Sequence, residues 1–174
     1  MPMSEYMRGL RDKVGTAVIE VPTVSVVIFD ERQRVLLVRH VEGNEWTTPG
    51  GMVEPYEIPS DAAVRETWEE TGLHVALKRI VGVFGGEICS GAYSNGDRIS
   101  WVSTLFEAER LSGTPRPDGD ETLEVRYFDR SELSDVRCKR HALLFLDAAF
   151  GASTPAYFQP ATWRPLDDTR SVVA

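Results

Sequence analysis

Glu66, Glu69 and Glu70 stand close together near the end of the segment Pro59 to Thr71. If this segment is a helix, a rotation of about 100° per residue places the three carboxylates in a wedge of roughly 100° on one side. Carboxylates three or four positions apart repel one another by about 0.2–0.5 kcal/mol per pair. The last helical turn, where Glu69 and Glu70 stand, also disfavours negative charge. The cluster therefore favours a bound cation. The alternative is that this is an ordinary glutamate-rich helix face exposed to solvent.

The residues around the glutamates indicate which cation would fit. Arg65 can reach Glu69 at i,i+4, but one guanidinium cannot neutralise three carboxylates. Glu57 adds a fourth acid, and Gly50 and Gly51 permit close backbone approach and leave carbonyl groups exposed before the helix. Such hard oxygen ligands suit Mg²⁺ or Mn²⁺. Because no His or Cys accompanies them, zinc is disfavoured.

The elements that must position these side chains can be read from local signals. Pro59 in the first turn, Asp61 near the positive end and Gly72 at the end predict a helix over Pro59 to Thr71. The apolar face of the segment 137–150 predicts a second helix. Strands are predicted at Thr23 to Asp30, Arg34 to Val41, Val75 to Phe84, Ile99 to Ala108 and Leu123 to Phe128. The short connection between the first two predicts a hairpin.

The chain is predicted to form one mixed α and β domain over residues 1–150, followed by an arm or tail over 151–174. The arm would be packed by Tyr157, Phe158 and Trp163, or else be loose. The segments Gly85 to Arg98 and Ser112 to Glu121 are glycine-rich and long, and they are candidate ligand loops or mobile surface excursions.

The composition excludes several classes of protein. With 42% hydrophobic and 26% charged residues the chain is of the soluble globular type, which excludes a fibrous or wholly disordered protein. A formal charge of -8 disfavours large nucleic acids and anionic membranes as partners. No apolar run approaches the roughly 20 residues that span a bilayer, and no secretory signal is recognisable. Two cysteines without metal-type spacing indicate a reduced, cytoplasmic protein.

The acidic segment resembles the signature of the Nudix hydrolase family, which includes MutT-like proteins. The fixed positions of that signature are matched here by Gly51, Glu57, Arg65, Glu66, Glu69, Glu70 and Gly72, with Leu73 as the closing aliphatic residue. A chance match at a given start has a probability of roughly one in 10⁸. Thr67, Tyr56 and Ile58 depart from the residues usual at their positions, but none of them replaces a charged position.

The resemblance implies a Nudix-type α/β/α sandwich with a mixed β-sheet. It also implies a Mg²⁺- or Mn²⁺-dependent pyrophosphohydrolase that cleaves the diphosphate link of a nucleoside diphosphate derivative. That substrate would be a nucleotide, a nucleotide-sugar or an ADP-ribose-like compound. The metal ligands carried over by position are the Gly50 carbonyl and the carboxylates of Glu66, Glu69 and Glu70. Arg65 would orient a glutamate, and Glu57 would pair with Arg65 or hold a second metal ion through water.

Which carboxylate acts as the general base is left open by the resemblance. Family members place the base either in the helix or on a later loop. Glu66 is the first candidate, and Glu121 is the leading candidate outside the helix, followed by Asp120 and Glu87. Exposed acids are common, so each of these outside carboxylates also has an ordinary surface role as its alternative.

Substrate contacts are predicted at Arg39, for phosphate, and at four aromatic residues that could stack on a base or border the entrance. These are Trp46, Tyr56, Tyr93 and Trp101. Aromatic residues near strands more often belong to the core. The proline that many ADP-ribose hydrolases of the family carry beyond the signature is replaced here by Cys89.

Two other functions were weighed against hydrolysis. The family's isopentenyl diphosphate isomerases need a catalytic Cys in a matching context, and none is placed here. A ligand sensor that binds nucleotide without cleaving it usually loses signature glutamates, whereas this chain keeps all four. The expected partners are a small phosphorylated nucleotide-like substrate and, by the family's habit, a second copy in a homodimer.

Overall fold

The computed structural model describes residues 4–93, 95–151 and 156–158. Its helices are α1 (Glu5–Val14), α2 (Pro59–Thr71) and α3 (Arg140–Phe150), with short 3₁₀ helices η1 (Glu87–Cys89) and η2 (Arg130–Ser134). Its strands are β1 (Val18–Ile28), β2 (Val35–His40), β3 (Trp46–Thr47), β4 (Gly50–Met52), β5 (Leu73–Phe84), β6 (Ser90–Ala92), β7 (Arg98–Gly113), β8 (Thr122–Phe128) and β9 (Tyr157–Phe158).

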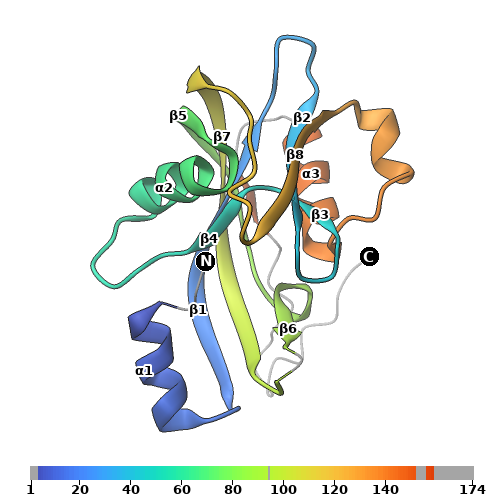
Figure 1. Cartoon of the computed structure of the whole chain (residues 1–174). Coiled ribbons are helices and arrows are strands. Elements are labelled where there is room, and N and C mark those ends of the chain that lie inside the picture. The colour runs from blue at the N-terminus through green and yellow to red at the C-terminus, as the bar shows by residue number, and fades with distance from the viewer. Residues whose placement is uncertain (1–3, 94, 152–155, 159–174) are drawn as a thin grey trace, which may run out of the picture.

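The strands form two sheets between helices. The larger sheet has the order β4-β1-β7-β5-β9, with β6 paired to β7, and the smaller has the order β3-β2-β8. The pair β1–β7 is parallel and the pair β5–β7 antiparallel, so the larger sheet is mixed. Helix α2 covers one side of the sheets and α3 the other (Figure 1). The predicted α/β/α sandwich with a mixed sheet is confirmed.

Neighbouring residues of β1 point into different cores, as the alternation of a strand requires. Val26 packs with Ala62 and Ala63 of α2, whereas Val27 packs with Phe145 of α3. Strand β2 behaves in the same way, with consecutive residues in opposite clusters. Continuous apolar runs of this kind are expected of strands that are covered on both faces.

The predicted hairpin between the first two strands is wrong, although its turn exists. The Asp30 N–H donates to the Arg34 carbonyl at 3.0 Å, and a single bridge joins Phe29 to Val35. Beyond that bridge the strands separate: β1 pairs with β4 and β7, and β2 pairs with β3 and β8. Each strand therefore has a partner on both sides in its own sheet, and the two strands do not pair along their length.

Several boundaries also differ from those predicted. Helix α3 begins at Arg140 because the preceding backbone is engaged elsewhere: Trp46 N–H donates to the Arg137 carbonyl and Lys139 N–H donates to the Trp46 carbonyl. Helix α1 was not predicted. The first predicted loop contains η1 and β6, and β7 extends to Gly113, into the second.

The described end of the chain joins the larger sheet. Strand β9 pairs in parallel with Gly82 and Val83 of β5, and the Tyr157 ring stacks on Phe84 at 5.2 Å. Residues 152–155 and 159–174 of the predicted arm, Trp163 among them, lie outside the described residues. None of the helices in the described part of the chain has the length and apolar character needed to cross a membrane.

Candidate active site

Helix α2 presents the acidic residues from a firmly anchored backbone. Pro59 begins it, and Gly72 ends it in the left-handed conformation, at φ 67°. Ala62 and Ala63 are fully buried against the sheet. Thr67, one of the departures from the family pattern, is also fully buried, and its hydroxyl donates to the Ala63 carbonyl at 2.7 Å. This face of the helix is therefore tightly packed.

Arg65 is the central cation of the acidic cluster. Its guanidinium donates to both oxygens of Glu57, each at 2.9 Å, which is a bidentate pair. It also donates to Glu66 at 2.7 Å and to Glu69 at 3.2 Å. A further donor reaches the Met52 carbonyl at 3.1 Å. The hydrogen bonds from Arg65 hold the pKa of Glu57 below its usual value, and those carboxylates raise the pKa of Arg65.

Glu66 lies deeper than its partners, with 8% of the residue exposed. Burial raises the pKa of its carboxyl to about 7, against the opposing effect of Arg65 and with a smaller contribution from Glu70 and Glu69. A buried group with such a pKa can exchange a proton near neutral pH, which is what a general base requires.

Glu70 does not contact Arg65 and instead faces Gly50 and His40. Its Oε2 accepts the Gly50 N–H at 2.9 Å, and its Oε1 lies 3.2 Å from Nε2 of His40 at the end of β2. A β-carbon on Gly50 would collide with the Val24 carbonyl, so this approach of β4 to β1 requires glycine. His40 was not predicted, because no spacing relation in the sequence connects it with Glu70.

The carboxylates of this cluster are suitable ligands for a hard divalent cation, but their oxygens do not converge on one position. Within the described residues no three His, Cys, Asp or Glu side chains form a group that could hold a metal ion as they stand. The reason is the present pairing, in which Arg65 engages Glu66 and Glu69 while Glu70 faces Gly50. Carboxylate and carbonyl oxygens are nevertheless the donors that Mg²⁺ and Mn²⁺ prefer. Rotation of the glutamate side chains would be needed to bring them together.

The predicted outside base, Glu121, stands beside this cluster. Its carbonyl accepts the N–H of Val41, the residue after His40, at 2.8 Å. The loop before it is held by Asp118, whose Oδ1 accepts the N–H groups of Asp120 and Glu121 at 2.9 and 3.1 Å. Glu121 is therefore carried to the end of β2, next to the residue that contacts Glu70.

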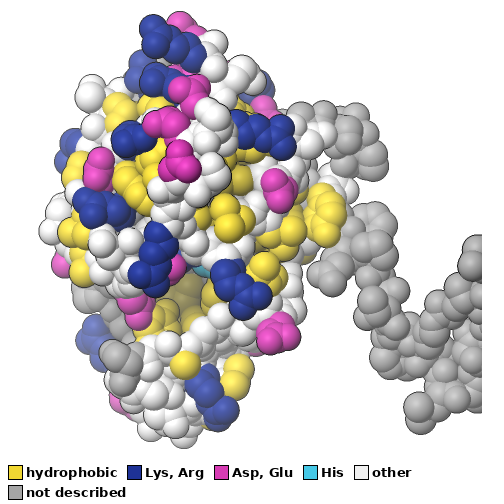
Figure 2. Space-filling view, turned by 90° about the vertical axis from the view of Figure 1, so that its right-hand side faces the viewer, with side chains coloured by type: hydrophobic (Ala, Val, Ile, Leu, Met, Phe, Trp, Pro, Cys, Tyr) yellow, Lys and Arg dark blue, Asp and Glu magenta, His cyan; other side chains and the backbone are white. Residues whose placement is uncertain are grey.

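A cavity of ≈ 390 Å³ opens on the face that carries β3 and α3. Figure 2 shows this face hollowed, with apolar side chains on the floor of the recess and basic side chains around it. Two predicted stacking residues, Tyr93 and Trp101, line the cavity. The other lining residues are Glu42, Gly43, Glu45, Glu87, Ile88, Ser90, Gly91, Ala92, Ile99, Lys139, Arg140 and His141. The cavity thus combines aromatic and apolar side chains with charged ones of both signs, and concave sites of this size commonly hold small molecules.

Two histidines lie at these two places, His141 in the wall of the cavity and His40 in contact with Glu70 of the acidic cluster. His141, in the cavity wall, lies with its Nε2 3.4 Å from Oγ1 of Thr47 and packs edge-on against Trp101 at 5.3 Å. Burial, with smaller contributions from the nearby Lys139 and His40, lowers the pKa of His141 to about 4.

Three other residues predicted to contact substrate, Arg39, Trp46 and Tyr56, do not line this cavity. Arg39 is engaged by Glu124 at 3.0 Å and by Asn44 at 2.9 Å. Trp46 is buried in the core, edge-on to Phe128 at 4.6 Å, so it offers no open face to a base. Tyr56 is fully exposed in the loop before α2, at 106% of the reference area, and lines neither cavity.

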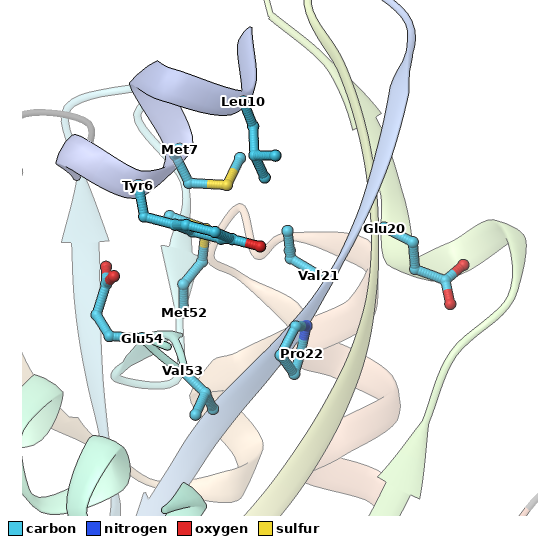
Figure 3. A pocket seen from close by; sticks show the side chains of 9 residues that line it. All are labelled: Tyr6, Met7, Leu10, Glu20, Val21, Pro22, Met52, Val53 and Glu54. Carbon is cyan, nitrogen blue, oxygen red and sulfur yellow. The ribbon is translucent and has the colours of Figure 1, made fainter. Parts of the chain in front are cut away.

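A second cavity, of ≈ 50 Å³, lies between α1 and the end of β4. Figure 3 shows Tyr6, Met7 and Leu10 of α1 facing Val21 and Met52. Its size and apolar lining leave no room for a nucleotide. Helix α1 therefore packs against the segment that leads into the acidic helix.

Comparisons with known proteins identify the family and the fold. A family model described as NUDIX domain matches residues 20–147. A MutT-like protein of Streptomyces ambofaciens is 31% identical over 130 residues, which cover 75% of this chain and 77% of that protein. A putative 8-oxo-dGTP diphosphatase of Bacillus subtilis is 44% identical over 108 residues, covering 62% of this chain and 66% of that protein. The crystal structure of an ADP-ribose pyrophosphatase from Streptococcus suis has a TM-score of 0.59 at 22% identity, covering 79% and 96% of the two chains, which shows a shared fold.

Proposed function

Since the chain belongs to the NUDIX domain family, whose hydrolases act on phosphoanhydride bonds, we propose that it is a pyrophosphohydrolase dependent on Mg²⁺ or Mn²⁺. It cleaves the diphosphate link of a nucleoside diphosphate derivative. The observation that supports this most strongly is the concentration of Glu57, Glu66, Glu69 and Glu70 around Arg65 and Gly50 at α2.

When bound, a divalent cation would supply the positive charge that an acidic site needs before it can accept phosphate oxygens, and it would make the attacking water more acidic. Glu66, Glu69, Glu70 and the Gly50 carbonyl would hold it. Glu66 accepts a proton as water attacks one phosphorus, the anhydride P–O bond breaks, and the leaving phosphate oxygen takes the bonding electrons. Glu121 is the alternative acceptor.

The cavity is proposed to hold the nucleoside or the group linked to it. Trp101 and Tyr93 supply faces for stacking, and Lys139 and Arg140 oppose the negative charge of the chain as a whole. Substrates of this kind include 8-oxo-dGTP and ADP-ribose, which appear in the names of the relatives, and nucleotide-sugars.

The experiment is a hydrolysis screen with the full chain. Nucleoside triphosphates including 8-oxo-dGTP, ADP-ribose, dinucleoside polyphosphates and sugar nucleotides are incubated with Mg²⁺, with Mn²⁺ and with EDTA. Hydrolysis of at least one class only in the presence of metal supports the proposal, and reaction in H₂¹⁸O identifies the attacked phosphorus. Tight binding of a nucleotide without turnover of any compound would instead identify a sensor.

A further inference from the structure

His40 is a polar residue of the site that lies outside the signature. It ends β2, and the pairing of β2 with β8 shifts register between Arg39 and His40. Such an irregularity redirects a side chain. Here the side chain of His40 is directed towards α2, where its Nε2 lies 3.2 Å from Glu70 and only 18% of the side chain is exposed.

Glu70 depends on this contact, because its carboxylate is buried. Only 4% of the residue is exposed, and its two oxygens have one partner each: the Gly50 N–H for Oε2 and His40 for Oε1. A buried carboxylate without polar partners is costly, whereas a polar partner at each oxygen restricts the rotation of its plane. Each oxygen keeps a second lone pair, which remains available to another ligand.

His40 is itself held on a rigid support. Its N–H donates to the Glu45 carbonyl at 3.1 Å, and its backbone pairs with Thr122 of β8. The backbone N–H of the adjacent Val41 donates a hydrogen bond to the Glu121 carbonyl. A residue whose backbone is held in this way on both sides can present its side chain in a fixed position, and that side chain can orient a neighbouring metal ligand such as Glu70.

We propose that His40 is a positioning residue, which holds the Glu70 carboxylate in the orientation needed to bind the divalent cation. The inference rests on the proposed function and deepens it. Polar residues in contact with metal ligands commonly contribute about 10–100-fold to metal affinity or activity. We therefore expect His40 to act on metal affinity and on kcat, and to leave the KM for the nucleotide nearly unchanged.

The test compares His40→Leu, which removes the donor, with His40→Gln, which retains an N–H group. His74→Gln is the matched control, because His74 is exposed on β5. Mn²⁺ affinity is measured by the loss of the free Mn²⁺ signal in electron paramagnetic resonance, and thermal unfolding checks each fold. We expect His40→Leu to weaken Mn²⁺ binding by about tenfold or more, His40→Gln to restore part of it, and the control to match the wild type.

The same measurement in a Glu70→Gln background separates positioning from a general effect. If His40 acts through Glu70, adding His40→Leu to Glu70→Gln causes no further loss of Mn²⁺ affinity. Equal Mn²⁺ affinity of His40→Leu and the wild type, or an undiminished loss in the Glu70→Gln background, would overturn the inference while the proposed function stands. If the wild type itself takes up no Mn²⁺ or Mg²⁺, the proposed function fails, and the positioning role fails with it.

Discussion

The carboxylate of Glu66 lies directly against the backbone of Gly51, where an added β-carbon would stand 2.5 Å from it. This contact closes the space around Glu66 on the side of β4. The side chain is thus placed in a site that suits its protonated form in the absence of metal, as its raised pKa indicates. The same burial prepares it for a cation, which would replace the proton.

The raised pKa of Glu66 predicts that Glu66→Gln stabilises the metal-free protein at high pH. A carboxyl with a folded pKa of about 7 and an ordinary value of 4.5 loses stability as the pH rises between those values. At about 1.4 kcal/mol per pH unit, the Gln variant should gain up to about 3 kcal/mol at pH 8 and little at pH 4.5. Urea unfolding in EDTA at both values measures this, with the exposed Glu109→Gln as control. A gain in stability that does not depend on pH would contradict the raised pKa of Glu66.

The acidic helix was predictable because its signals are local. Pro59 and Gly72 mark its ends, and its period places the glutamates on one side, so the predicted bounds and the observed bounds agree. The hairpin after Asp30 was not predictable in the same way. Whether two apolar strands pair with each other or with distant segments is decided by what covers their faces, and covering elements are distant in sequence.

The limits of the site prediction have a similar cause. His40 stands 30 positions before Glu70, and only the folding of β2 against α2 brings them together. Trp46 and Trp101 look alike in sequence, since each is an aromatic residue in a strand. The first is enclosed in the core and the second borders a cavity, a difference that arises from packing between the sheets and α3.

Trp101 and Tyr56 provide a matched test of the cavity. Stacking of a base on an aromatic side chain contributes about 1–3 kcal/mol, so Trp101→Ala should raise the KM for the nucleotide about tenfold with a smaller change in kcat. Tyr56→Ala should leave both constants unchanged, because Tyr56 is fully exposed and lines neither of the two described cavities. Steady-state kinetics of both variants, on the substrate found in the screen, measures these two constants. Equal effects of the two substitutions would place the nucleoside elsewhere.

His141 predicts a loss of stability on acidification. Its pKa is lowered to about 4 from 6.5, so the unfolded chain binds the proton more tightly, and stability falls as the pH decreases through that interval. At pH 5 this amounts to a loss of up to about 2 kcal/mol relative to pH 7, which His141→Gln should remove. Urea unfolding of both proteins at the two pH values measures it. The exposed His74→Gln should keep the wild-type dependence, and the same dependence in His141→Gln would contradict the prediction.

The most direct measurement is calorimetric titration of Mg²⁺ and Mn²⁺ into the full chain and into Glu69→Gln, combined with a hydrolysis assay of both. Glu69 is the most accessible of the three helix carboxylates, so its substitution should leave the fold intact. The wild type is predicted to bind the metal and to hydrolyse a nucleoside diphosphate derivative only when it is bound. Glu69→Gln is predicted to lose at least 100-fold in activity, roughly 2.7 kcal/mol or more of transition-state stabilisation, while Glu109→Gln behaves as the wild type. Full metal-dependent activity in Glu69→Gln, or hydrolysis by the wild type in EDTA, would contradict the assignment of the acidic helix as the metal site.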